Sequence, residues 1–221
     1  MKRVGWLATG VCLLCLAGSA SAGVVPYGVQ NDVPLDTILN DWGWTIVYQG
    51  DYGNSESLET MFGGATGEYV MLAGIQDGSS TVDVLAAAPT SEVFTYTALN
   101  ATHAANGAEW YYNGSSMGFA GLGEAIQQNS ADGYDVWTLG SPERDRLSWH
   151  TLGGSGSTPT AVDGGWRSGP TLYLNSGDTG WDRLVLTYTG DVVASVPAPG
   201  AILLGTLGAG LVGWMRRRRA L

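Results

Sequence analysis

The stretch "WDRLVLTYTG", residues 181–190, carries the clearest structural signal in this chain. Two sets of side chains alternate along it: Asp182, Leu184, Leu186 and Tyr188 in one set, and Arg183, Val185, Thr187 and Thr189 in the other. Successive side chains of a β-strand point to opposite faces, so this period of two predicts a strand rather than a helix. Gly190 provides a turn signal directly after it.

Similar short runs of β-branched and aromatic residues recur along the chain between clusters of turn residues. The expected strands cover 43–49, 67–74, 81–88, 91–99, 109–114, 134–140, 146–152, 171–175 and 181–190. A short helical turn is expected only at 35–39 and at 121–128. Many short strands without a strand–helix–strand rhythm predict an all-β fold, an antiparallel β-sandwich or jelly-roll-like body, and argue against a parallel sheet.

The charge of the chain is unevenly distributed. Residues 23–195 contain all twenty acidic residues and only four arginines, with no lysine, so that 4 minus 20 gives a net charge of −16. A body of this charge repels phosphate backbones, which excludes nucleic acid as its partner. Both cysteines, Cys12 and Cys15, lie before this body, so it contains neither a disulfide nor a thiolate metal site.

The first 22 residues read as a signal peptide. A basic start is followed by an apolar helix-forming run over 4–17 and by the small residues Ala20 and Ala22 at the −3 and −1 positions. This arrangement predicts export across the inner membrane by the Sec translocon and cleavage by signal peptidase. We expect the mature chain to begin at Gly23.

The last residues have the features of a membrane anchor. Residues 200–215 carry no charge, and sixteen helical residues span about 24 Å, slightly short of a full bilayer core. Arg216, Arg217, Arg218 and Arg219 follow. By the positive-inside rule they would hold the end of a transmembrane helix in the cytoplasm, with the body on the far side.

The tail, with Val196-Pro197-Ala198-Pro199, the apolar span and the arginine cluster, resembles the PEP-CTERM sorting signal of Gram-negative bacteria. Ala198 stands where that family usually has glutamate. The resemblance implies recognition by a membrane exosortase, transient anchoring in the inner membrane, and delivery to the cell surface or to an extracellular polysaccharide matrix or biofilm. An ordinary C-terminal anchor that is never removed is the alternative.

These features divide the chain into three expected parts: a signal peptide (1–22), an exported acidic β-rich domain (23–195, core about 35–191) and a sorting tail (196–221). Parts of the domain also resemble a recurring exported domain to which no biochemical activity is assigned. They are "EWYYNGSSMGFA" (109–120), "ERDRLSWHT" (143–151), "GGWRSG" (164–169) and "WDRLVLTYTG" (181–190).

One catalytic pattern is present. Residues 114–118 read Gly-Ser-Ser-Met-Gly, the Gly-x-Ser-x-Gly pattern of a nucleophile elbow, with Ser116 at its centre and His150 downstream. An elbow needs a strand before the serine and a helix after it, within a parallel sheet. An all-β chain does not supply that setting, so we expect a protein that is not an enzyme, with a serine hydrolase as the least favoured alternative.

Metal and cofactor sites are not expected from the sequence. His103 and His150 are too far apart to suggest a zinc site. Two segments, 51–56 and 175–182, place acidic and amide side chains at spacings that Ca²⁺ could use. Such side chains usually cap their own turn, which is the simpler interpretation. The glycine-rich stretch 153–165 has no lysine and is expected to be a flexible loop rather than a phosphate-binding loop.

The aromatic residues allow a binding role. Tryptophan usually fills the space between two sheets, which is the expectation for most of these rings. We expect Trp110, Tyr112 and Trp166 to be the exposed ones, suited to stacking on sugar rings. The sequence therefore favours a non-enzymatic surface or matrix protein, with a carbohydrate-binding module that tethers exopolysaccharide as the alternative.

Overall fold

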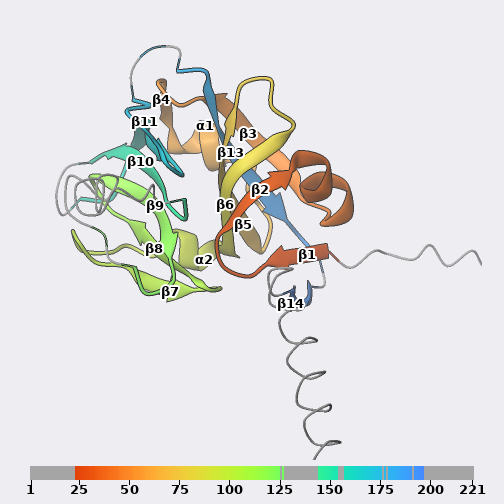
Figure 1. Cartoon of the computed structure of the whole chain (residues 1–221). Coiled ribbons are helices and arrows are strands. Elements are labelled where there is room, and N and C mark those ends of the chain that lie inside the picture. The colour runs from red at the N-terminus through yellow and green to blue at the C-terminus, as the bar shows by residue number, and fades with distance from the viewer. Residues whose placement is uncertain are drawn as a thin grey trace, which may run out of the picture.

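The computed structural model describes residues 23–124, 126, 144–153, 157–175, 177, 179–190 and 192–196. Over these residues the protein is mostly antiparallel β-sheet, which confirms the all-β expectation. Two large sheets pack against each other, and a small two-stranded sheet lies at one end (Figure 1). The expected signal helix (1–22), the transmembrane span (200–215) and the predicted strand at 134–140 lie outside the described residues.

The first large sheet has five strands. In spatial order they are β2 (Gln30–Pro34), β6 (Thr81–Pro89), β5 (Tyr69–Gln76), β13 (Trp181–Tyr188) and β3 (Thr45–Asp51). Every neighbouring pair is antiparallel. The strand predicted from "WDRLVLTYTG" is therefore β13, and it lies inside the sheet between β5 and β3.

The alternation along β13 sends side chains into two cores. Leu184 and Leu186 belong to a core on the far side of the sheet, together with Ile38 and Trp44. Val185 belongs to the core between the two large sheets, together with Trp149. Burial of both faces removes a large apolar area from water, which is the main stabilising contribution available to a body without disulfides.

The second large sheet has seven strands. Six form the path β12 (Thr171–Leu172), β11 (Ala161–Ser168), β10 (Leu147–Leu152), β9 (Ser116–Gly121), β8 (Ala108–Tyr112) and β7 (His103–Ala105), and β4 (Ser55–Ser57) pairs with β11. Along this path each strand pairs with its neighbour in the chain, as in a meander. In a jelly roll successive strands alternate between sheets, so β7 to β12 do not follow the order of a jelly roll, which was one of the two arrangements expected from the sequence.

The remaining elements are short. Strand β1 (Gly23–Pro26) pairs in parallel with β14 (Val192–Val196). A helical turn, η1 (Thr37–Asp41), confirms the turn expected near 35–39, and α1 (Leu58–Phe62) and α2 (Thr90–Val93) are single turns. Within the described part of the chain, no helix is long and apolar enough to cross a membrane.

Two expectations for the secondary structure of the body were wrong. The run 91–99 is not a strand: α2 occupies its start, Val93 is buried, and the ring of Phe94 packs edge-on against Phe62 at 5.0 Å and Tyr112 at 5.6 Å. Further along the run only Thr97 is buried, where its N–H donates to the Tyr112 carbonyl at 2.9 Å, so the β-branched and aromatic residues of the run misled the prediction. The stretch 153–165 was expected to be a loop, yet β11 already begins at Ala161.

Candidate ligand-binding surface

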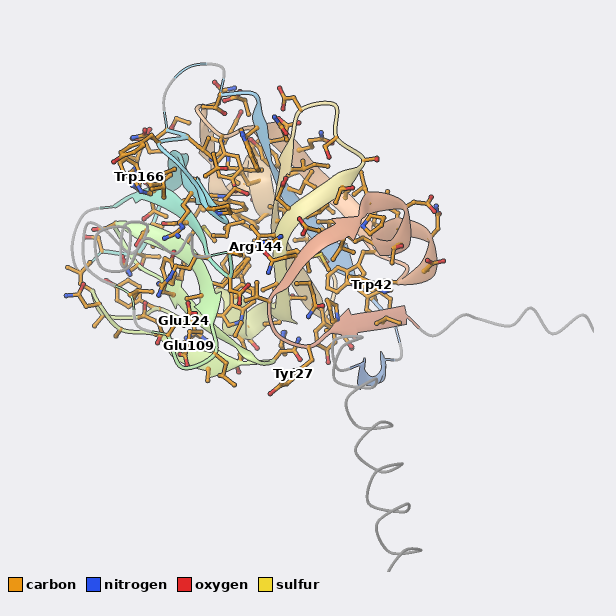
Figure 2. All side chains as sticks on the ribbon, in the orientation of Figure 1. Tyr27, Trp42, Glu109, Glu124, Arg144 and Trp166 are labelled. Carbon is orange, nitrogen blue, oxygen red and sulfur yellow. The ribbon has the colours of Figure 1, made fainter. Side chains whose placement is uncertain are left out.

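A row of four side chains crosses the outward face of the seven-stranded sheet. Ser116 of β9 lies directly opposite His150 of β10. The His150 ring stacks on the Trp166 ring of β11, with centroids 5.4 Å apart and an interplanar angle of 24°. Trp166 in turn meets Tyr173 edge to face at 4.8 Å and 70°. We call Ser116, His150, Trp166 and Tyr173 the aromatic row; Figure 2 labels Trp166.

The alternation of β10 points His150 outward. Its neighbour Trp149 is fully buried between the sheets, where its ring meets Tyr52 edge-on at 6.5 Å. Successive residues of a strand face opposite sides, so His150 projects from the other face. The sequence placed this histidine beside a core tryptophan but gave no sign of what lies across the sheet.

A bulge in β11 turns Trp166 outward. Ser148 pairs with Arg167 and Trp149 pairs with Gly165, so Trp166 has no residue opposite it. Such a bulge adds one residue to a strand and re-aims its side chain. Trp166 is half-buried, so it is less exposed than the sequence led us to expect.

Tyr173 has an unusual backbone conformation. Its φ angle is 65°, in the left-handed region that non-glycine residues seldom adopt. The next residue, Leu174, donates its N–H to the Trp166 carbonyl at 3.2 Å and enters the core between the sheets. This left-handed residue lets the chain bury Leu174 while the Tyr173 ring stays 61% exposed.

Ser116 is fixed by the turn that precedes it. The Asn113 side-chain oxygen accepts the N–H groups of Ser115 and Ser116 at 3.0 and 3.2 Å, and the Asn113 carbonyl accepts the Thr151 hydroxyl at 2.6 Å. These bonds join β9 to β10 beside the aromatic row. The structure therefore brings together Ser116 and His150, the pair of the hydrolase alternative.

The setting of Ser116 differs from that of a nucleophile elbow. The serine begins strand β9, which continues to Gly121, where an elbow would have a helix. Gly118 is also confined within the sheet, since a Cβ there would lie 2.0 Å from the Leu147 carbonyl oxygen. The glycine of the pattern thus serves a close approach between β9 and β10.

Two of the three rings expected on the surface are buried. Trp110 is 1% exposed, packs against Phe119 at 5.5 Å, and donates its Nε1–H to the Ala105 carbonyl. Tyr112 is also buried, and this burial raises its pKa. Both residues of β8 point into the space between the sheets, so the prediction of their exposure was wrong.

The two segments considered for Ca²⁺ do meet in space. The Asp51 carboxylate accepts the backbone N–H groups of Gly53 and Thr179, which joins the two loops. The guanidinium of Arg183 donates to the carbonyls of Asp51 at 3.1 Å and Asn54 at 2.6 Å. The positive charge beside these two loops is thus the Arg183 guanidinium. In the residues described, no group of three metal-ligating side chains is found.

Of the residues expected to direct cleavage and sorting, only Gly23 and Val196 are among those that the structure describes. Gly23 begins β1, donates its N–H to the Tyr188 hydroxyl at 2.8 Å, and lies so near that ring that a Cβ would be 2.1 Å away. Strand β14 ends at Val196, which pairs with Pro26 of β1. Ala20, Ala22, Pro197, Ala198, Pro199 and Arg216 to Arg219 lie outside the described residues.

The fold and the site together define an all-β protein of two packed antiparallel sheets with an aromatic surface on one of them. Comparison of the chain with models of protein families, with curated proteins and with solved structures found no match. The candidate function therefore rests on the residues themselves.

Proposed function

We propose that this chain is an exported, non-enzymatic surface or extracellular-matrix protein whose β-rich body binds polysaccharide through the aromatic row. The observation that carries the proposal is Tyr173, whose ring is 61% exposed although its backbone is held in the left-handed region beside Trp166. Strained backbone conformations cluster at ligand sites, where the surrounding structure maintains them.

The chemistry of the row suits a sugar. An exposed phenol ring can stack on the apolar C–H face of a pyranose while the phenol hydroxyl remains hydrated. Trp166 supports the Tyr173 ring from the side, and His150 and Ser116 place polar groups along the same line. The net charge of −16 over residues 23–195 favours a neutral polysaccharide, because an acidic one would be repelled at low salt.

The ends of the domain support the export part of the proposal. Strands β1 and β14 pair in parallel, so the residue expected after signal cleavage and the residue that opens the tail lie on one small sheet. Figure 1 shows both strands at the same end of the body. A chain anchored in a membrane through either end would therefore present the same side of the domain to it. We propose cleavage by signal peptidase from the sequence of the first 22 residues, and sorting by an exosortase from the resemblance of the tail to the PEP-CTERM signal.

The binding test uses the full-length chain in gels cast with neutral polysaccharides. We expect retarded migration that Tyr173→Ala abolishes. Tyr96→Ala is the matched control, because Tyr96 is similarly exposed at 45% but lies outside the aromatic row. Equal retardation of the wild type and Tyr173→Ala would refute the binding surface, as would unretarded migration of the wild type across the panel. Ester hydrolysis lost on Ser116→Ala would favour the hydrolase instead.

The sorting test is the intact mass of the exported protein. We expect a chain that begins at Gly23 and lacks Arg216 to Arg219, with cleavage near Pro199. An exported chain that retains the four arginines would show that the tail is a permanent anchor.

A further inference from the structure

The space between the two large sheets contains a second group of polar side chains, separate from the aromatic row. Arg183 of β13, Tyr52, and Trp149 and Ser168 of the other sheet all reach into it. All four side chains are almost completely buried. We call Arg183, Tyr52, Trp149 and Ser168 the interior polar cluster.

Glycines on both sides of Arg183 make room for this cluster. Arg183 pairs with Gly50 of β3 and with Gly74 of β5, so the three residues form one row across the sheet. A Cβ on Gly74 would lie 2.0 Å from the Ser168 hydroxyl oxygen and 2.6 Å from the Tyr52 hydroxyl. A Cβ on Gly50 would lie 2.4 Å from the Tyr48 hydroxyl. Polar atoms thus occupy the places where side chains of the sheet would otherwise pack.

One nitrogen of the Arg183 guanidinium, Nη2, has hydrogen-bond acceptors. Its Nη2 atom donates to the carbonyls of Asp51 and Asn54 and lies 3.5 Å from the Tyr48 hydroxyl. Its Nε and Nη1 atoms are buried and have no hydrogen-bond partner among the described residues, and no described carboxylate lies within ion-pair distance. A buried cation with unpaired donors is strongly destabilising unless something compensates it.

The other members of the cluster also have unpaired polar atoms. Trp149 Nε1, the Tyr52 hydroxyl and the Ser168 hydroxyl are buried without a hydrogen-bond partner in the part of the chain described. Trp149 and Ser168 both interact with the Tyr52 hydroxyl closely enough to lower its pKa, although their orientation falls short of regular hydrogen-bond geometry. Burial raises the pKa of Tyr52 to about 12, so at neutral pH its hydroxyl is protonated and can donate.

We infer that the interior polar cluster binds a small monovalent anion of the size of chloride, held by Arg183, Trp149 and the hydroxyls of Tyr52 and Ser168. The arginine and tryptophan N–H groups can only donate, and each hydroxyl can turn its proton inward. An anion accepts from all of them and neutralises the guanidinium, whereas a water molecule accepts at most two bonds and leaves the charge in place. Because the cluster is fully buried, only a small ion can enter it without displacing these side chains.

The test measures the Tm of the full-length chain at constant ionic strength while chloride replaces gluconate, an anion too large to enter. We expect a saturable rise, about 5 °C at 200 mM chloride for a Kd of ~10 mM. Bromide should act similarly. Crystals grown in bromide should show an anomalous peak beside Arg183 Nε or Nη1.

Variants separate this site from a general salt effect. Arg183→Met should abolish the chloride-dependent rise, whereas Arg144→Met should keep it, since Arg144 pairs with Asp32 on the surface. If Arg183→Met fails to fold, Tyr52→Phe removes one donor and retains the ring, and it should weaken the apparent chloride affinity several-fold. Equal Tm values in chloride and gluconate, an unchanged response in Tyr52→Phe, or ordered water in place of the anomalous peak would each overturn the inference.

Discussion

Replacement of Tyr173 by glycine and by alanine separates the cost of its backbone from the value of its ring. Both substitutions remove the contact with Trp166, and only glycine relieves the φ angle of 65°. The comparison of the two variants therefore isolates the backbone contribution, and the comparison of alanine with the wild type isolates the ring.

The magnitudes follow from the geometry. An edge-to-face aromatic pair contributes about 0.5–1.5 kcal/mol, so Tyr173→Ala should lower the free energy of unfolding by about 1 kcal/mol. The left-handed conformation costs an L-residue about 1–2 kcal/mol, and glycine loses about 0.4–1 kcal/mol more in chain entropy on folding. We expect Tyr173→Gly to be more stable than Tyr173→Ala by about 0.5–1 kcal/mol.

Urea unfolding of the full-length chain, followed by tryptophan fluorescence, measures these differences as shifts in midpoint at a constant m-value. Polysaccharide binding, measured on the same samples, should be lost in both variants and retained in Tyr173→Phe. Equal stabilities of the glycine and alanine variants would show that the backbone at Tyr173 is not strained. Binding retained by Tyr173→Gly would show that the ring is not the contact surface.

Three further changes test the fold. Burial raises the pKa of Tyr52 from 10.0 to about 12. The protonated hydroxyl therefore stabilises the fold below pH 10, and this contribution is lost as the pH rises from 10 to 12. The free energy of unfolding in urea should fall by about 3 kcal/mol less over this pH range in Tyr52→Phe than in the wild type. Leu72→Ala, at a fully buried position of β5, should lower the free energy of unfolding by about 2–5 kcal/mol in the same assay, and an effect below 1 kcal/mol would contradict the core. Ser57→Ala removes the side-chain cap that accepts the Thr60 N–H at 3.0 Å and should cost about 1 kcal/mol, with Ser57→Thr as a control close to wild type.

The strands were predictable where one physical signal dominated. In β13 the alternation of apolar side chains has the period of a strand, and nothing in the segment competes with it. At 91–99 the same residue types occur, but Thr90 donates its N–H to the Glu68 carbonyl and starts a helical turn. That bond depends on a residue far along the chain, so no local pattern contains it.

The aromatic row was only partly predictable. Trp110 and Trp166 were both expected on the surface, yet Trp110 is buried and Trp166 is half-buried. The difference comes from the bulge that leaves Trp166 unpaired in β11, and a bulge depends on how two strands align. Tyr173 was missed because its exposure follows from the burial of Leu174, its neighbour, in a core formed by distant strands.

The composition explains how the body packs without disulfides. Several glycines lie where an aromatic ring from another strand or loop packs directly on the backbone. The Tyr188 ring lies against Gly23, and the Tyr52 ring lies over Gly165. A Cβ at Gly165 would be 1.9 Å from the Tyr52 ring, so no other residue fits there without movement. The high glycine content and the high aromatic content are therefore linked, because the rings pack against backbone that carries no side chain. The same arrangement leaves room for a buried arginine, because a sheet that accepts rings over glycines can also accept a guanidinium between two of them.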